Sequence, residues 1–195
     1  MIIIFGSAGS GKSLQGQLLA ARHGWRWLAS GQMFRDYTDE EAMSYIKKGE
    51  LVPDEITNRV VFRALDKANM CSDIERVVLD GYPRTVEQAQ ALVDHEQKRC
   101  GKDGVSMCIV LEVSRDEAIK RLTRRGREED DQADAIDRRL QIYRSEIYPL
   151  LNFFNELEVP IVHVDGMGSV GEIHDRIESE VVSYGVVPPI AGEEK

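Results

Sequence analysis

The sequence predicts an α/β fold in which a parallel β-sheet is covered by helices on both faces. Three observations support this prediction. Strand-like and helix-like segments alternate along the 195-residue chain, the strand-like segments are short apolar runs, and the first of them leads into a glycine-rich loop. Continuous apolar runs are typical of parallel strands, because both faces of such sheets are buried. A hydrophobic content of 42% is enough for one domain with a sizeable core.

The first half of the chain holds two expected strands and three expected helices. The strands are residues 2–5 and 76–80, and the helices are residues 12–23, 40–48 and 54–70. Gly24 and Gly49 follow the first two helices, where a helix commonly ends on glycine, and Pro53 stands where the third would begin. Residues 29–60 carry no strand pattern, so we expect no strand between the first and second core strands.

The second half continues the alternation. Strands are expected at residues 105–113 and 160–164, and helices at residues 85–99, 132–148 and 170–183. A further helix begins at Ser114, where S-R-D-E forms a capping box, and runs toward Arg124. Pro149 is expected to end the helix that precedes it. Residues 185–195 are rich in proline and glycine and are expected to be loosely held.

The composition excludes some partners and cofactors. The chain has 34 Asp and Glu against 25 Lys and Arg, so we expect neither nucleic acid nor an anionic membrane as its main partner. No run reaches transmembrane length and no basic segment precedes an apolar one at the N-terminus, which favours a cytoplasmic protein. Cys71, Cys100 and Cys108 lie far apart, which predicts neither a disulfide framework nor a structural zinc ion.

The glycine-rich loop has the pattern of a phosphate-binding loop. Residues 6–13 read G-S-A-G-S-G-K-S, which satisfies G-x-x-x-x-G-K-[ST], and they stand between an apolar strand and a helix. In such a loop, backbone N–H groups and the positive end of the helix face a polyphosphate. Lys12 would reach the β- and γ-phosphates, and the Ser13 hydroxyl would lie on Mg²⁺. A chance match in a Gly/Ser-rich turn is disfavoured by the flanking strand and helix.

A second group of candidate residues follows the strand at residues 76–80. That strand ends in Asp80, and a carboxylate at this place in phosphate-loop proteins holds Mg²⁺, mainly through its waters. The next residues, G-Y-P-R-T at 81–85, predict a tight turn that presents Arg84 at the carboxyl end of the strand. Ligands bind at this end of the strands in open α/β sheets.

Residues 80–85, D-G-Y-P-R-T, resemble the D-G-[FY]-P-R-T segment of the nucleoside monophosphate kinases, and specifically of the adenylate kinases. The resemblance covers most of the chain, and its motifs occur in the family's order. The further matching segments are L-A-S-G at 28–31 with Met33 and Arg35, G-E-L-V-P-D-E at 49–55, Gln88, Arg121 with Arg125, Arg127 with D-D-Q at 130–132, R-R-L at 138–140, and V-D-G at 164–166.

The resemblance implies a fold, a domain plan and a reaction. The fold would be that of the P-loop NTPases, a five-stranded parallel sheet flanked by helices on both faces. Residues 1–28, 53–123 and 133–184 would form the core, 29–52 an NMP-binding insertion, 124–132 a short lid, and 185–195 the tail. The reaction would be Mg·ATP + AMP ⇌ 2 ADP, with Mg²⁺ as cofactor and ATP, AMP and ADP as partners. We expect a monomer, because two moving insertions leave little surface for a fixed partner.

The resemblance also implies roles for single residues. The residues that would hold ATP are Gly9, Ser10, Gly11, Lys12, Ser13, Leu14, Arg121 and Gly168. Those that would hold AMP are Ser30, Gly31, Arg35, Glu50, Leu51, Val52, Gly81, Arg84 and Gln88, the last as the reader of adenine. Those that would act on the transferring group are Lys12, Arg84, Arg125, Arg127 and Arg139, with Ser13 and Asp80 placing Mg²⁺.

The chain departs from the family pattern most clearly at its lid. The zinc-binding cysteines of long lids are absent, and the segment is shorter than typical short lids. Aligning Asp130 and Asp131 with the family puts Glu128 at the lid-arginine position, and a one-residue shift would restore Arg127. We therefore expect the lid to shield the site less and to allow some ATP hydrolysis without AMP.

Two alternative functions stay open at this point. A kinase of the same architecture could use another acceptor, such as UMP, CMP or a non-nucleotide alcohol, although Ser30 and Gln88 favour adenine. A regulatory protein could bind ATP and turn it over weakly or not at all. The presence of Lys12, Asp80 and Arg84, together with Arg139, argues against that second alternative.

Overall fold

Five parallel strands form one sheet in the computed structural model, which describes residues 1–36, 40–68, 77–101, 104–126 and 133–187. The strands are β1 (Ile2–Gly6), β2 (Arg26–Ala29), β3 (Val77–Asp80), β4 (Met107–Glu112) and β5 (Ile161–Asp165). They lie in the order β2-β3-β1-β4-β5, and every pairing is parallel. The predicted α/β fold with a five-stranded parallel sheet is therefore confirmed.

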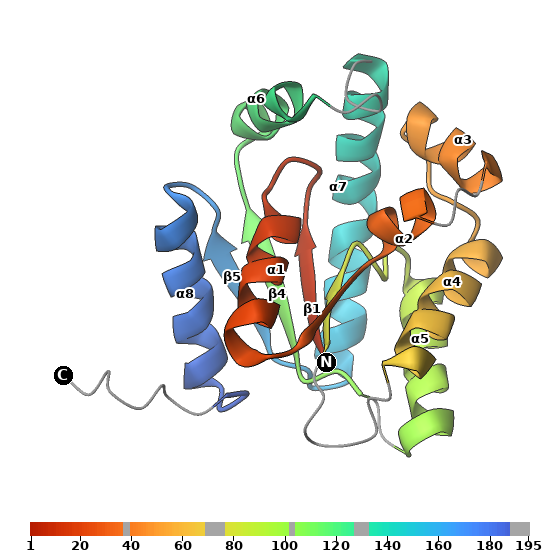
Figure 1. Ribbon diagram of the computed structural model, residues 1–195, viewed down its shortest axis with the longest axis vertical. Coiled ribbons are helices and arrows are strands. Elements are labelled where there is room, and N and C mark those ends of the chain that lie inside the picture. The colour runs from red at the N-terminus through yellow and green to blue at the C-terminus, as the bar shows by residue number, and fades with distance from the viewer. Residues whose placement is uncertain (37–39, 69–76, 102–103, 127–132, 188–195) are drawn as a thin grey trace.

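Helices cover both faces of this sheet (Figure 1). The helices on one face are α1 (Lys12–His23) and α8 (Val170–Ser183), and those on the other are α4 (Asp54–Lys67), α5 (Val86–Cys100) and α7 (Ala133–Glu156). The helices toward the carboxyl end of the strands are α2 (Ser30–Asp36), α3 (Glu40–Lys48) and α6 (Arg115–Arg125). None of the helices in the described ranges combines the length and the apolar composition that a membrane span requires.

The side chains of β1 show how the two layers form. Ile3 and Phe5 pack with residues of α4, α5 and α7, whereas Ile2 and Ile4 pack with residues of α1 and α8. This division follows from the two-residue period of a strand. All four side chains are at most 6% exposed. The strand is therefore buried on both faces, as its unbroken apolar pattern predicts.

A third, smaller hydrophobic cluster lies beside the carboxyl end of the sheet. Its buried members are Ala118 and Leu122 of α6 together with Ile136 and Leu140 of α7. Ala8 of the loop after β1 packs against this cluster. The cluster therefore joins the two helices on either side of residues 127–132, and it does so without a strand residue among its buried members.

β2 is a strand that the sequence pattern does not reveal. The expectation of no strand between the first and second core strands is wrong. The segment R-W-L-A carries no β-branched side chain, and only Ala29 among its residues is buried, because β2 is an edge strand. Trp27 packs so closely on α1 that a Cβ on Gly16 would lie 3.1 Å from the indole ring.

α7 continues through Pro149, although the sequence predicts that the helix ends there. A proline inside a helix removes a hydrogen bond and costs about 3 kcal/mol. Ile147, Leu150 and Phe154 lie on both sides of Pro149 along the chain, and all three are buried in the main core. Burying one such side chain contributes about 1.5–3 kcal/mol, so the three together outweigh the proline.

Hydroxyl side chains cap several helices near their predicted starts. Ser114 accepts a hydrogen bond from the Glu117 backbone N–H at the start of α6. The Glu117 carboxylate, however, accepts hydrogen bonds from Lys120 and Arg121, so only half of the predicted capping box forms. A complete box occurs at the start of α8, between Ser169 and Glu172.

The cysteines differ in their bonding. Cys108 is a free thiol buried in β4, and burial raises its pKa far above the usual range. Cys100 is disulfide-bonded. The wide spacing of the cysteines along the chain gives no sign of this bond, because sequence separation does not report which residues the fold brings together.

Candidate functional site

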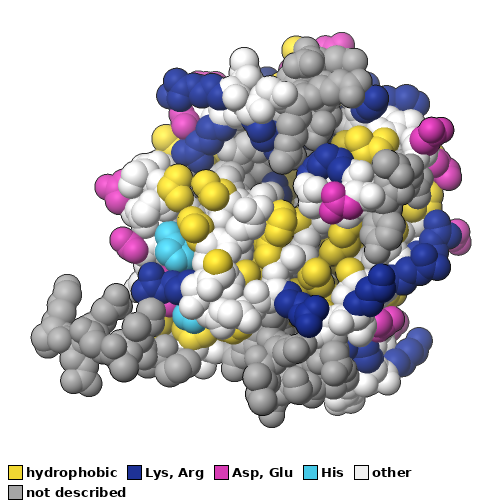
Figure 2. All heavy atoms as spheres, in the orientation of Figure 1, with side chains coloured by type: hydrophobic (Ala, Val, Ile, Leu, Met, Phe, Trp, Pro, Cys, Tyr) yellow, Lys and Arg dark blue, Asp and Glu magenta, His cyan; other side chains and the backbone are white. Residues whose placement is uncertain are grey.

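A cleft opens at the carboxyl ends of β1 and β3. The connection from β1 leads toward the β2–β3 side of the sheet, whereas β4 pairs with β1 on the other side. Ligands of open α/β proteins bind at such a switch point. A cavity of about 230 Å³ lies there, with walls from the loop after β1, α2, the turn after β3, α6 and α7. Figure 2 shows Lys and Arg side chains gathered around this hollow.

The loop between β1 and α1 has the backbone of a phosphate cradle. Gly9 has φ +83°, and a Cβ there would lie 2.4 Å from the Ala118 carbonyl oxygen of α6. Only glycine therefore fits this position without moving α6. Gly11 precedes α1 in a left-handed conformation and gives no side-chain cap. The first N–H groups of α1 thus stay available to an anion.

Lys12 carries its charge into the cleft from the first turn of α1. Its Nζ donates a hydrogen bond to the Ser7 carbonyl oxygen at 3.1 Å, and the side chain lines the cavity. Burial, followed by the positive charges of Arg84, Arg125 and Arg139, lowers the pKa of Lys12 to about 8, against the opposing effect of Asp80. Burial and the neighbouring arginines therefore disfavour the charged form of Lys12 as long as no anion is bound.

Asp80 and Arg84 stand at the carboxyl end of β3. Asp80 pairs in register with Ile4 of β1, is 3% exposed, and has one buried carboxylate oxygen without a hydrogen-bond partner among the described residues. Arg84 donates from Nε to the Gly81 carbonyl oxygen at 2.8 Å and lines the cleft. Burial lowers the pKa of Arg84, and Asp80 opposes that shift. A buried carboxylate oxygen without a partner can bind a metal ion directly or accept a hydrogen bond from a water of that ion.

The opposite wall comes from α2 and the start of α5. Ser30 donates a hydrogen bond to the Gly81 carbonyl oxygen at 2.7 Å, and Arg35 donates to Gln32 at 3.2 Å. Gln88 is 1% exposed, lines the cavity, and bonds to the backbone of Arg84 and to the carboxylate of Asp54. This wall combines cations with a buried amide, which suits a ligand that has both a phosphate and a base.

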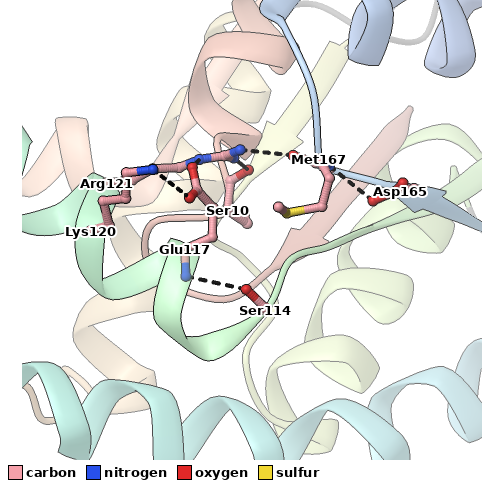
Figure 3. Close-up of polar contacts among 8 residues, drawn as sticks. Ser10, Ser114, Glu117, Lys120, Arg121, Asp165 and Met167 are labelled. Atoms are coloured by element: carbon pink, nitrogen blue, oxygen red, sulfur yellow. Dashed lines mark hydrogen bonds and ion pairs between the residues drawn. The ribbon is translucent and has the colours of Figure 1, made fainter.

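Arg121 of α6 joins three separate segments (Figure 3). Its Nη1 donates to the Ser10 carbonyl oxygen at 3.1 Å, its Nη2 to the Gly166 carbonyl oxygen at 3.0 Å, and its Nε to Glu117 at 2.8 Å. A Cβ on Gly11 would lie 3.7 Å from Nη1, so the guanidinium also borders the loop after β1. Arg121 therefore ties α6, this loop and the segment after β5 together.

Two further arginines reach the cavity from the helices that flank residues 127–132. Arg125 ends α6, and Arg139 lies in the second turn of α7, where its Nε donates to the Ala135 carbonyl oxygen. Both line the cavity and both act on the pKa of Lys12. The three cations therefore lie close enough together to bind one anion.

α3 meets the start of α7 above the cleft. Arg138 donates from Nη1 to the Lys48 carbonyl oxygen at 2.7 Å and pairs with Glu50 at 3.3 Å. A Cβ on Gly49 would lie 2.4 Å from the Ala135 carbonyl oxygen, so the backbones approach closely here. The segment that carries α3 is thus held against α7 by a direct contact.

The predicted site residues fall into three groups. Those that line the cavity are Lys12, Ser13, Ser30, Gly31, Arg35, Glu50, Leu51, Val52, Asp80, Gly81, Arg84, Gln88, Arg125 and Arg139. Those in the loop after β1, on α1, or hydrogen-bonded to that loop are Gly9, Ser10, Gly11, Leu14 and Arg121, whereas Gly168 lies between β5 and α8, beside Glu172. Arg127 lies outside the described residues, as does most of the predicted lid.

Two residues of the site are not evident from the sequence. Asp54 has the pattern of a helix-start carboxylate, but it also holds Gln88, which is 34 positions away in the chain. Helical spacing predicts that Arg138 points away from Arg139, and it gives no sign of the partners Lys48 and Glu50. Neither contact leaves a local pattern, because both join segments that are distant in sequence.

The chain is similar to known proteins over most of its length. Residues 4–159 match the family model described as adenylate kinase. Similar proteins include an adenylate kinase of Mycobacteroides abscessus, 36% identical over 183 residues, which cover 90% of this chain and 95% of that protein. Adenylate kinases of Mycobacterium ulcerans and Parabacteroides distasonis are each 35% identical, over 90% and 92% of this chain and 95% and 96% of theirs.

Proposed function

Because the chain belongs to the adenylate kinase family, whose members are phosphotransferases that catalyse ATP + AMP = 2 ADP, we propose that its cleft performs this reaction with the residues that line it. The observation that carries the assignment is the convergence of Lys12, Asp80, Arg84 and Arg139 on one cavity. Asp80, Arg84 and Arg139 shift the pKa of Lys12, and Asp80 and Arg139 also shift the pKa of Arg84. Such a cluster suits two polyanions that must be brought into line.

ATP binds on the phosphate-loop side in this proposal. The N–H groups of the loop and of the first turn of α1 hold its phosphates, and Lys12 spans the β- and γ-phosphates. The pKa of Lys12 rises when ATP enters, because the phosphate charges favour the ammonium form. The fixed backbone of Gly9 against α6 keeps the loop in its binding shape before ATP arrives.

AMP binds on the opposite side of the same cavity. Arg35 and Arg84 hold its phosphate with guanidinium groups that match phosphate oxygens. Ser30, Gly31, Gly81 and the 50–52 backbone border its nucleoside, and Gln88 contacts its base. The AMP phosphate is ionised at neutral pH, so it attacks without a general base.

Arg125 and Arg139 act on the group in transfer. They enter from α6 and α7 and share the cavity with Lys12. Positive charge at the equatorial oxygens stabilises the transition state, and one arginine in this place is worth roughly 10³–10⁵ in rate. In this proposal residues 124–132 form the lid and 29–52 the AMP-binding insertion, and closing both reduces the access of water to the reaction, although the short lid does so incompletely.

The donor set at the end of β3 fits Mg²⁺ as the cofactor. Among the described residues no group of three or more His, Cys, Asp or Glu could hold a metal ion. Mg²⁺ in kinases needs few protein ligands, because nucleotide phosphates and waters fill most of its positions. Asp80, with a buried free oxygen, would hold its waters, and the Ser13 hydroxyl would be a direct ligand. When bound with ATP, Mg²⁺ neutralises charge that develops on the β- and γ-phosphates.

We also propose that the protein works as a monomer in the cytoplasm. The net charge of −9 supports a protein that stays dissolved and apart from anionic surfaces. Two closing segments on one face leave little fixed surface for a second copy. Size-exclusion chromatography with light scattering at several concentrations tests the first statement, and a mass near 44 kDa, twice the chain's 22.0 kDa, would contradict it.

A panel of phosphoryl acceptors tests the proposed function. The purified protein is incubated with Mg·ATP and separately with AMP, dAMP, UMP, CMP and GMP, while nucleoside diphosphate is followed. ADP formation with AMP that is lost in Arg84→Ala supports the proposal. A faster pyrimidine acceptor would identify a UMP/CMP-type kinase. ATP binding without any turnover would identify a regulatory protein instead.

The same assay tests the lid. ATP is incubated without an acceptor, and phosphate release is followed. A slow release is expected, because a short lid would admit water to the γ-phosphate. Complete absence of release would contradict the expectation that this lid shields the site poorly.

A further inference from the structure

The side-chain amide of Gln88 is held at both of its polar atoms. Its Nε2 donates to Oδ1 of Asp54 at 2.7 Å, and its Oε1 accepts from the Arg84 backbone N–H at 2.8 Å. The residue is 1% exposed and borders the cleft. The amide therefore has two fixed partners before any nucleotide is bound.

Only one orientation of the amide allows hydrogen bonds to both partners. A backbone N–H can only donate, and an ionised carboxylate can only accept. A 180° flip of the amide would bring its NH₂ against the Arg84 N–H and its oxygen against the Asp54 carboxylate. Both hydrogen bonds would be lost in a buried place where unmade bonds are costly. The orientation of the amide is thus fixed by which partner donates and which accepts a hydrogen bond, and not only by the packing around it.

Asp54 is itself held in position for this contact. It lies in the first turn of α4, where the positive end of the helix favours a carboxylate. The Thr85 hydroxyl lies 3.3 Å from its Oδ2, and the same hydroxyl accepts from the Gln88 backbone N–H at 3.1 Å. Asp54, Thr85 and Gln88 therefore close a ring of hydrogen bonds that joins α4 to α5.

The fixed amide still offers one donor and one acceptor. An amide oxygen has a second lone pair, and an amide nitrogen has a second hydrogen. Adenine presents a donor at N6 beside an acceptor at N1, whereas guanine presents an acceptor at O6 beside a donor at N1. The two purines therefore require opposite directions of the same amide, and a mismatch leaves buried polar groups unpaired.

We propose that Asp54 is a specificity-determining positioning residue, which holds Gln88 in the direction that accepts adenine and rejects guanine. This inference rests on the proposed function, in which Gln88 contacts the base of the acceptor nucleotide. Asp54 itself does not touch the base. It acts through Gln88, and the Arg84 backbone N–H acts as the second restraint.

Asp54→Asn is the decisive substitution, because asparagine keeps the shape and can either donate or accept. One of the two restraints on the amide is then removed. We expect kcat/KM for GMP relative to AMP to rise by about tenfold or more, since a hydrogen bond to a charged group is worth about this much. The change should appear in the KM values of the two acceptors, because Asp54 acts on nucleotide binding through Gln88. Glu55→Gln, an exposed carboxylate in the same turn, is the matched control and should leave the ratio unaltered.

The outcomes separate this inference from the function on which it rests. Wild-type protein that forms no ADP from AMP would overturn the proposed function and Asp54's role together. Wild-type turnover of AMP with an unchanged AMP-to-GMP ratio in Asp54→Asn would overturn only the role of Asp54. A parallel rise in Glu55→Gln would also overturn it, because the effect would then come from lost charge.

A measurement on the wild-type chain covers the case in which Asp54→Asn does not fold. The side-chain amide of Gln88 is assigned by NMR from its loss in Gln88→Leu. One of its protons should be shifted downfield and exchange slowly with solvent. Gln90, which pairs with Asp94 at 2.9 Å on the surface, is the reference. If the Gln88 amide protons exchange as fast as those of Gln90, the fixed orientation is refuted.

Discussion

Raising the pH should remove the positive charge of Lys12 from the ligand-free enzyme well before any ordinary lysine would lose it. The pKa of this side chain is lowered to about 8, first by burial and then by Arg84, Arg125 and Arg139. At a pKa of about 8, about nine tenths of the molecules carry the charge at pH 7 and about one tenth at pH 9. In the proposed function this charge holds the ATP phosphates, so ATP binding should weaken above pH 8.

The size of the effect follows from the shift between the free and the bound enzyme. ATP phosphates favour the charged lysine, so the pKa of Lys12 in the complex moves back toward its ordinary value near 10.5. Between the two values, kcat/KM for ATP should fall about tenfold for each pH unit. kcat reports the complex and should stay nearly constant over the same range. The ATP phosphates are already ionised here and add no titration of their own.

Steady-state kinetics from pH 6.5 to 10 provide the assay. kcat/KM for ATP is measured at saturating AMP, and kcat/KM for AMP is measured at saturating ATP. The first should break near pH 8, and the second should not, because Lys12 is then covered by ATP. Lys12→Arg is the control: its guanidinium stays charged throughout, so its weaker activity should show no break near pH 8.

Two results would refute this reasoning. A wild-type profile that is flat to pH 10 would mean that burial and the three arginines do not lower the pKa of Lys12. A break near pH 8 that persists in Lys12→Arg would mean that another group causes it. Binding of a non-hydrolysable ATP analogue, followed by calorimetry over the same range, gives the same distinction without turnover.

Four further substitutions test other parts of the structure. Arg84→Ala should lower kcat/KM for AMP by about 10³-fold or more in a coupled ADP assay, while the melting temperature stays unchanged. Gly9→Ala should lower the free energy of unfolding by about 2 kcal/mol or more in urea titration, because its Cβ would lie 2.4 Å from the Ala118 carbonyl oxygen at a φ of +83°; a neutral result would mean that the loop can move away from α6. Pro149→Ala should raise the free energy of unfolding by about 1–2 kcal/mol, since a helical N–H is restored, and a lower melting temperature would contradict this explanation. Arg138→Ala should change stability by less than about 1 kcal/mol, because its ion pair is 46% and 41% exposed, yet raise KM for AMP several-fold, an effect that high salt should reproduce in the wild type.

The layers of the fold could be predicted from the sequence because β1, β3 and β4 are each built on an unbroken apolar run with clear ends. Prediction fails where local pattern and tertiary packing disagree. β2 has an ordinary composition and exists because it pairs with β3 at the sheet edge. Pro149 signals a helix end locally, but burial of Ile147, Leu150 and Phe154 in the core decides against it.

The candidate site divides in the same way. Lys12, Asp80 and Arg84 lie in short motifs whose chemistry is visible in the residues themselves. The contact between Asp54 and Gln88 and the contact of Arg138 with Lys48 leave no motif, because each joins distant segments. Arg121 is expected beside ATP, and its three hydrogen bonds to Ser10, Gly166 and Glu117 could not be derived from one helix alone.

The small hydrophobic cluster between α6 and α7 has an evolutionary consequence. Because Ala118, Leu122, Ile136 and Leu140 fix both helices, the segment between Arg125 and Ala133 is joined to two anchored ends. A longer segment between fixed ends adds only about 0.6 kcal/mol for each doubling of its length. If this segment is the lid of the proposed function, lids of different length should therefore be tolerated here without any change in the sheet or in the loop after β1.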